Sequence, residues 1–239
     1  DEAYFCHVGF VVDGQPLALA SPHAAQAAGI AIIYQEFNLV NELSVSENIH
    51  LGREICRWGV INHSAEQAAT AELFQRLGAH VESEARCRDL TLAQQQLVEI
   101  AKALSYDARI VVMDEPTAAL SGDDVSRLLQ IARDLKQQGL GIIYISHRLE
   151  EVFDVADRII VLRDGFVVGE YRADETTHEQ LIEAMVGRPV SAEFPSRQVE
   201  LGPERMRVEN LSRGTEVRNV SFSLRGGEVL GIGGLSGAG

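Results

Sequence analysis

The sequence is poor in cysteine and in basic residues, and it has no long apolar run. Its three cysteines, Cys6, Cys56 and Cys87, are odd in number and widely separated, which fits neither a disulfide framework nor a zinc site. Acidic residues outnumber basic ones by 35 to 21, and the net charge of −14 disfavours a nucleic-acid partner. No apolar stretch approaches the roughly 20 residues that span a bilayer. We therefore expect a soluble chain from a reducing compartment, which reaches a membrane only through a partner.

Apolar periodicity predicts alternating strands and helices over most of the chain. Short β-branched runs predict buried strands at 29–34, 109–113 and 141–145, and the continuous apolar run of the second predicts burial on both faces. Turn dipeptides predict hairpins around Asp13-Gly14 and Asp164-Gly165. Amphipathic spacing predicts helices over 44–51, 64–77, 91–104, 121–138 and 177–186. This order predicts an α/β fold with a parallel sheet.

Several of these helices carry finer expectations. Ser44 or Ser46 is expected to cap the first helix, and Ser121 the fourth. The helix over 91–104 is expected to keep Glu99 and Lys102 largely off its buried face. The helix over 64–77 should turn one row of residues toward the core, namely Ala65, Ala69, Leu73 and Leu77.

Acidic and imidazole side chains follow two of the predicted strands directly. Asp114 and Glu115 end the strand at 109–113, and His147 follows the strand at 141–145. Parallel sheets bind ligands at these carboxyl ends, where an Asp holds Mg²⁺, a Glu polarises water and a His stabilises a transferred phosphoryl group. Taken singly, the acids also fit solvated residues before a turn, and the histidine fits a surface position.

Five segments together resemble the motifs of ATP-binding-cassette (ABC) ATPases. In chain order they match the Q-loop, signature, Walker B, D-loop and H-loop, at Gln35, Leu90 to Gln96, Ile110 to Thr117, Ala119 to Ser121 and Ile145 to His147. The signature departs from Leu-Ser-Gly-Gly-Gln because Thr91, Leu92 and Ala93 replace the serine and both glycines. With residues 43–49 and 98–104, this variant resembles the first cassette of bacterial monosaccharide importers of the ribose, galactose and xylose type, whose ATPase carries two cassettes.

The resemblance implies a domain plan and two cofactors. The plan begins with a P-loop NTPase-like ABC ATPase domain at 1–186, which includes a helical signature region at about 44–106. A linker follows at 187–205, and a second cassette begins at 206–239. The first strands of that second cassette are expected at 206–211, 217–224 and 229–232. ATP and Mg²⁺ are the implied cofactors, with Glu115 and His147 catalytic and Asp114 and Gln35 at the metal. The implied nucleotide-binding residues are Gln35, Thr91, Leu92, Ala93, Gln94, Ser121, Gly234, Gly237 and Gly239. The positive end of the signature helix, expected to be uncapped, would bind a γ-phosphate.

A complete phosphate-binding loop is missing from the 239 residues. Gly234, Gly237 and Gly239 match only the start of such a loop, and no Gly-x-x-x-x-Gly-Lys-Ser/Thr occurs in residues 1–233. We therefore expect both cassettes to be cut, the first just upstream of Asp1, and this chain alone to bind ATP poorly.

These features favour a motor subunit of a sugar importer over two other classes. The implied partners are membrane permease subunits, a second cassette and, indirectly, a periplasmic sugar-binding protein, at the cytoplasmic face of the inner membrane. The segment near Gln35 to Arg53 is expected to contact the permease, and changes at Glu47 or Asn48 are expected to lower transport more than basal hydrolysis. A soluble ABC protein acting on ribosomes or DNA, and a nucleotide-free fragment without activity, are the alternatives.

Overall fold

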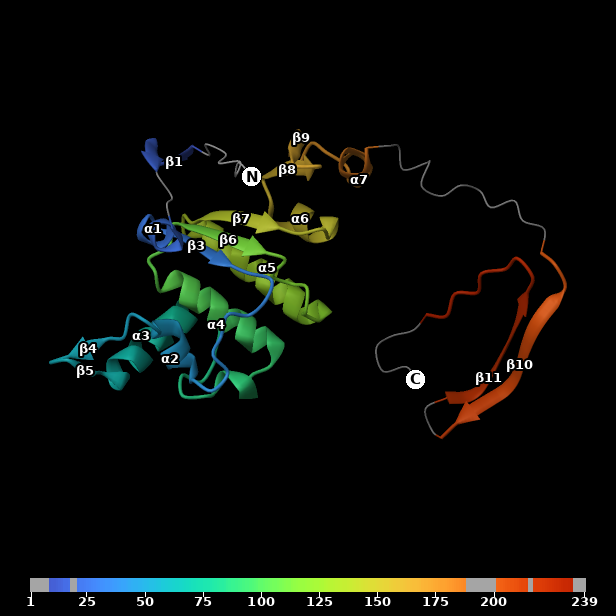
Figure 1. Cartoon of the computed structure of the whole chain (residues 1–239), viewed down its shortest axis with the longest axis horizontal. Helices are drawn as coiled ribbons and strands as arrows, with labels where there is room; N and C mark the ends of the chain where they lie inside the picture. The colour runs from blue at the N-terminus through green and yellow to red at the C-terminus, as the bar shows by residue number, and fades with distance from the viewer. Residues whose placement is uncertain (1–8, 18–20, 188–200, 215–216, 234–239) are drawn as a thin grey trace, which may run out of the picture. The chain divides into compact units, whose positions relative to one another are not determined.

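The computed structural model describes residues 9–17, 21–187, 201–214 and 217–233, shown in Figure 1. The chain divides into two units, Asp1–Met185 and Val186–Gly239. Of the expected features, the first half of the hairpin at 1–14, most of the linker and the glycines Gly234, Gly237 and Gly239 fall outside the described residues.

A three-stranded parallel sheet forms the centre of the first unit. Its strands are β3 (Ile30–Ile33), β6 (Ile110–Asp114) and β7 (Gly141–Ile145), in the order β3-β6-β7. Ile33 is in register with Met113, and Asp114 with Ile145, so all three strands end at one edge of the sheet. The predicted parallel sheet is confirmed.

One face of this sheet carries the core. The alternate residues Ala31, Ile33, Val111 and Met113 are buried with α4 (Leu92–Leu104) and α5 (Gly122–Gln137), and Figure 1 shows both helices on the same side of the sheet. The opposite face is open in the described part of the chain, since Ile32, Ile143 and Ile145 are 44%, 53% and 46% exposed. The expectation that residues 109–113 are covered on both faces is therefore wrong here, because side chains alternate across a strand and the described helices pack on one side.

A helical region projects from the sheet. It contains α2 (Val45–His50), α3 (His63–Arg76), α4, a short turn η1 (Cys87–Asp89), and a small hairpin of β4 (Cys56–Arg57) and β5 (Val60–Ile61). Ser44, and not Ser46, caps α2, in a capping box with Glu47.

The expected row of α3 is confirmed only at its end, where Leu77 is buried in the core and Leu73 packs against it. Within the helix the fully buried residues are Glu66, Thr70 and Phe74, one position along from the expected row. The shift follows from polar contacts, because Glu66 Oε1 accepts a hydrogen bond of 3.1 Å from the Ile55 amide and the Thr70 hydroxyl lies 3.3 Å from His50 Nε2.

The rest of the first unit consists of short helices and two hairpins. The hairpins pair β1 (Phe10–Val12) with β2 (Gln15–Leu17) and β8 (Arg158–Arg163) with β9 (Phe166–Arg172). Both predicted turn dipeptides are confirmed, since Asp13, Gly14, Asp164 and Gly165 have φ of 50°, 75°, 52° and 81°. The helices are α1 (Pro22–Ala27), α6 (Leu149–Val155) and α7 (His178–Val186).

The second unit is a long antiparallel hairpin. It pairs β10 (Glu204–Arg213) with β11 (Val217–Arg225), which confirms the first two strands expected there. Residues 229–232 are irregular, so the third expected strand is wrong; no strand among the described residues pairs with them.

None of the helices in the described ranges is both long and apolar enough to cross a membrane.

Candidate active site

Glu115 and His147 meet at the carboxyl edge of the sheet. Asp114 ends β6 opposite Ile145, and the Glu115 amide continues the ladder by donating to the Ile145 carbonyl at 2.9 Å. Glu115 Oε1 then lies 2.8 Å from Nδ1 of His147, which follows β7 by two residues. The two side chains are 28% and 66% exposed, so the pair is open to solvent on the histidine side. The structure thus brings together the two side chains that the sequence nominates for catalysis.

The backbone at Glu115 turns sharply to present this side chain. Its φ of 44° is left-handed, a conformation that costs a non-glycine residue on the order of 1 kcal/mol or more. The next turn closes through a hydrogen bond of 3.1 Å from the Ala118 amide to the Glu115 carbonyl. Such strain is typical of functional positions, where the surrounding structure holds a residue in place for its chemistry.

Asp114 and Gln35 supply the oxygen atoms that a metal would need at this edge. Gln35 is exposed and follows β3 by two residues, and β3 is the neighbour of β6. The described residues contain no group of three or more His, Cys, Asp or Glu side chains that could hold a metal. Mg²⁺ at nucleotide sites is usually bound through one or two protein oxygens, waters and the phosphates themselves. The donor set of Asp114 and Gln35 fits that kind of site.

The loop that follows Gln35 is held by the signature helix. Glu99 Oε1 accepts a hydrogen bond of 2.6 Å from the Asn38 amide, and Lys102 Nζ donates to the Asn38 carbonyl at 3.0 Å. Glu99 is buried, which raises the pKa of its carboxyl, while the Asn38 N–H and the Lys102 ammonium offset part of the rise. The expectation that Glu99 lies off the buried face is wrong, because this carboxylate is buried with a backbone partner.

Asn48 fastens the other end of the same loop. Its side chain accepts from the Val40 amide at 2.7 Å and donates to the Val40 carbonyl at 3.0 Å, and its Nδ2 also lies 3.1 Å from Cys87 Sγ. Asn48 is fully buried, so it holds this loop from the inside and offers no surface of its own to a partner. The Glu47 side chain accepts a hydrogen bond from the Ser44 amide, as the second half of the capping box of α2.

We predict that Asn48→Ala lowers the free energy of unfolding by about 2 kcal/mol, since it leaves the partly buried amide and carbonyl groups of Val40 without their side-chain partner. Urea denaturation of the 239-residue chain measures this. The exposed Asn41 provides the matched control, and Asn41→Ala should stay within about 0.5 kcal/mol of the parent. Equal stability of the two variants would contradict the role of Asn48.

The start of the signature helix is capped. Thr91 Oγ1 accepts from the Gln94 amide at 3.3 Å, and Gln94 Oε1 accepts from the Thr91 amide at 3.0 Å. The expectation of an uncapped end is therefore wrong, because the side chains form a capping box. Leu92 is 49% exposed beside this cap, with Ala93 following it. These side-chain hydrogen bonds join Thr91 and Gln94 to each other and do not reach Glu115 or His147.

Ser121 occupies the N-cap position of α5 without capping it. Its hydroxyl donates to Asp124 Oδ2 at 2.7 Å, and no side-chain cap bond forms. The residue is exposed, on the segment that follows Walker B. The expectation of a serine cap is wrong, because the hydroxyl donates its hydrogen bond to the Asp124 carboxylate and accepts none from a helix amide.

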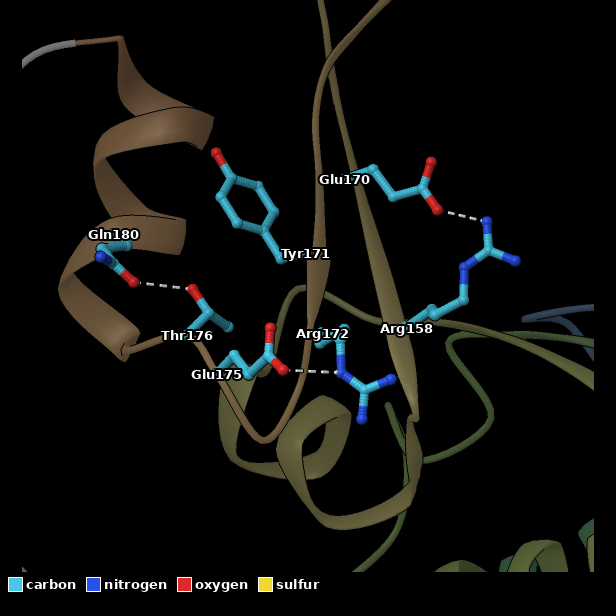
Figure 2. Close-up of a pocket in the computed structure, with 7 residues that line it drawn as sticks. All are labelled: Arg158, Glu170, Tyr171, Arg172, Glu175, Thr176 and Gln180. Atoms are coloured by element: carbon cyan, nitrogen blue, oxygen red, sulfur yellow. Dashed lines mark hydrogen bonds and ion pairs between the residues drawn. The ribbon is translucent and has the colours of Figure 1, made fainter.

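A cavity of about 720 Å³ lies elsewhere, between the β8-β9 hairpin and α7. Figure 2 shows its lining residues, which are Arg158, Glu170, Tyr171, Arg172, Glu175, Thr176 and Gln180. Its charges are paired with one another, Arg158 with Glu170 and Arg172 with Glu175 at 3.1 Å. The candidate active site is the sheet edge at Glu115 and His147, because a carboxylate and an imidazole meet there at the ends of two parallel strands, whereas the cavity is lined mainly by ion pairs.

Comparison with known proteins finds similarity to ABC proteins. The model of the family described as ABC transporter matches residues 7–118. The ribose import ATP-binding protein RbsA 1 of Rubrobacter xylanophilus is 48% identical over 229 residues, covering 96% of this chain and 46% of that protein. The ribose import ATP-binding protein RbsA of Chromobacterium violaceum is 45% identical, covering 96% of this chain and 46% of that protein. A putative ribose/galactose/methyl galactoside import ATP-binding protein of Burkholderia lata is 44% identical, covering 96% of this chain and 44% of that protein. The chain thus spans a little under half the length of these curated relatives.

Solved structures agree with the fold. An ATP-binding cassette of an ABC transporter, MJ1267 in its ADP conformation, has a TM-score of 0.62 at 22% identity, over 74% of this chain and 76% of the other. CbiO1 of Clostridium perfringens, part of the ABC transporter complex CbiONQ, has a TM-score of 0.60 at 21% identity, over 74% and 70%. The predicted fold class, a P-loop NTPase-like ABC cassette, is confirmed.

Proposed function

We propose, starting from the ABC ATPase cassette that this chain carries, that it forms part of the ATP-hydrolysing subunit of a bacterial importer for ribose or a related monosaccharide. Identity of 44–48% to ribose and galactose import proteins over nearly the whole chain supports the substrate class. The observation that carries the chemistry is the hydrogen bond of 2.8 Å between Glu115 and His147 at adjoining strand ends.

The geometry divides the work between these two side chains. Glu115, held at its strained turn, would accept a hydrogen bond from the attacking water and orient it toward the γ-phosphate. His147 bonds to Glu115 through Nδ1, which leaves Nε2 for a phosphoryl oxygen. When both ring nitrogens carry a proton, the imidazolium can donate one hydrogen bond to Glu115 and another to the phosphoryl oxygen.

Asp114 and Gln35 would hold Mg²⁺ beside this pair. When bound, the ion neutralises charge on the β- and γ-phosphates. Gln35 also begins the loop that Glu99 and Asn48 fasten, so its position is tied to the helical region. In the two-cassette assembly, Thr91 to Gln94, Ser121 and the glycines at 234, 237 and 239 would contact nucleotide.

The proposed partners are the permease subunits, with the sugar-binding protein acting through them, and a second cassette. The chain would then lie peripherally at the cytoplasmic face of the membrane. Because Asn48 is buried, the permease contact falls to exposed residues of the loop, such as Glu36, Asn41 and Glu42.

Reconstitution tests this assignment. The two-cassette protein, combined in vesicles with its permease and binding protein, should release phosphate several-fold faster when ribose or a related sugar is present, because substrate delivery is expected to favour closure of the cassettes. Hydrolysis that no monosaccharide stimulates, together with binding to ribosomes or DNA, would favour the soluble ABC alternative.

A further inference from the structure

The catalytic scheme leaves one buried carboxylate without a role. Glu151 lies in the first turn of α6 and is only 5% exposed. Its Oε2 accepts hydrogen bonds from the Thr117 hydroxyl at 2.7 Å, the Tyr144 hydroxyl at 2.8 Å and the Ser146 hydroxyl at 3.3 Å. Its Oε1 accepts from Arg148 Nη1 at 3.0 Å.

These four donors come from the two segments that carry the catalytic pair. Thr117 follows Glu115 by two residues, while Ser146 and Arg148 flank His147 on either side. Ser146 Oγ also accepts from the Arg148 amide at 3.0 Å, which fixes the backbone next to His147. A single carboxylate therefore ties together the loops after β6 and β7, behind the point where Glu115 meets His147.

The pKa shifts of Glu151 and Tyr144 favour an ionised Glu151 carboxylate that accepts hydrogen bonds from both loops. Burial works to raise the pKa of Glu151, but the hydrogen bonds from Thr117, Arg148 and Tyr144 outweigh it and hold that pKa below its usual value. Burial and the bond to Glu151 raise the pKa of Tyr144, which keeps the phenol a donor. An anionic carboxylate with two oxygens accepts from all four groups at once, and no neutral side chain of the same size does so.

We propose that Glu151 is a positioning residue, which holds the Thr117 and Ser146–Arg148 segments so that His147 reaches Glu115. Its functional meaning rests on the proposed ATPase activity. Glu151→Gln removes the charge and replaces one acceptor oxygen by an amide group that cannot accept, so either the Arg148 guanidinium loses its acceptor or the hydroxyls of Thr117, Tyr144 and Ser146 lose a shared one. The two loops should then separate and the Glu115–His147 hydrogen bond should weaken.

Nitrogen NMR of the histidine rings in the 239-residue chain tests the geometry without nucleotide. We expect Glu151→Gln to shift the His147 ring signals while leaving those of His80, which is 84% exposed, in place. Glu150→Gln, the same change at the adjacent exposed acid, should leave both unchanged. An unaltered His147 in folded Glu151→Gln protein would overturn the proposal.

Two further measurements keep the test decisive. If Glu151→Gln does not fold, Thr117→Val removes a single donor and should still shift the His147 ring signals. Unshifted His147 signals in Thr117→Val protein would also overturn the proposal.

In the two-cassette protein, Glu151→Gln should slow turnover on the order of 10- to 100-fold with ATP affinity retained, as a small misplacement of catalytic groups does. If the unmodified protein does not hydrolyse ATP, the proposed function fails, whereas the NMR result still decides whether Glu151 positions His147.

Discussion

Calorimetry of the 239-residue chain with Mg-ATP is expected to show binding at least about 100-fold weaker than that of the two-cassette protein, and steady phosphate release should be absent. In the proposed site, Gln35, Asp114, Glu115 and His147 would contact only the γ-phosphate and the metal. The cradle of backbone amides and the lysine of a phosphate-binding loop hold the other phosphates, and residues 1–233 contain no such motif. Each charge-assisted hydrogen bond contributes about 1.5–3 kcal/mol, so losing two or more accounts for a factor of this size.

The control is a polypeptide extended to include a Gly-x-x-x-x-Gly-Lys-Ser/Thr segment ahead of residue 1. That extension should restore binding, because the described site is otherwise assembled, with Glu115 and His147 already 2.8 Å apart. Micromolar affinity and steady phosphate release in the 239-residue chain would show that the loop is dispensable.

Glu115→Gln in the two-cassette protein is expected to slow phosphate release on the order of 100-fold or more, which is the usual scale for loss of a general base. The amide retains the size of the side chain but no longer carries the charge that polarises water. ATP affinity should remain, since Glu115 bonds to His147 and, in the proposed scheme, would contact the attacking water rather than the α- and β-phosphates. A phosphate-release assay measures the rate, and Glu150→Gln serves as the matched control because Glu150 is exposed.

The sheet and its edge could be predicted from sequence because their signals are local. Buried strands are short β-branched runs, and Asp-Gly turns need the left-handed conformation that Asp164 and Gly165 adopt. Asp114, Glu115 and His147 directly follow such runs, and parallel strands end at one edge, so their meeting could be expected from the strand order alone.

Buried polar residues could not be predicted in the same way. Periodicity placed Glu99 off the buried face, and it gave no reason to expect burial of Glu66 or Glu151, yet all three are buried with hydrogen-bond partners. Some of these partners are distant along the chain, since Asn38 is 61 positions from Glu99 and Thr117 is 34 positions from Glu151. No local pattern carries that information.

The cap at the start of the signature helix and the third strand of the second unit also differ from what the sequence predicted. Thr91 followed three residues later by Gln94 is itself a capping-box pattern, so the local sequence favoured an ordinary cap, whereas the resemblance to the ABC signature favoured an open helix end. In the second unit, residues 229–232 have the apolar character of a strand but no described partner, and strands form only in pairs.

The nucleotide retained by Glu115→Gln protein tests the central claim most directly. The two-cassette variant is incubated with Mg-ATP, freed of unbound nucleotide by gel filtration, and its bound nucleotide is identified by chromatography. If Glu115 and His147 form the hydrolytic centre, the variant should retain intact ATP, while the parent and the Glu150→Gln control should hold mainly ADP or no nucleotide. Recovery of ADP from Glu115→Gln protein at the level of the parent would contradict the assignment.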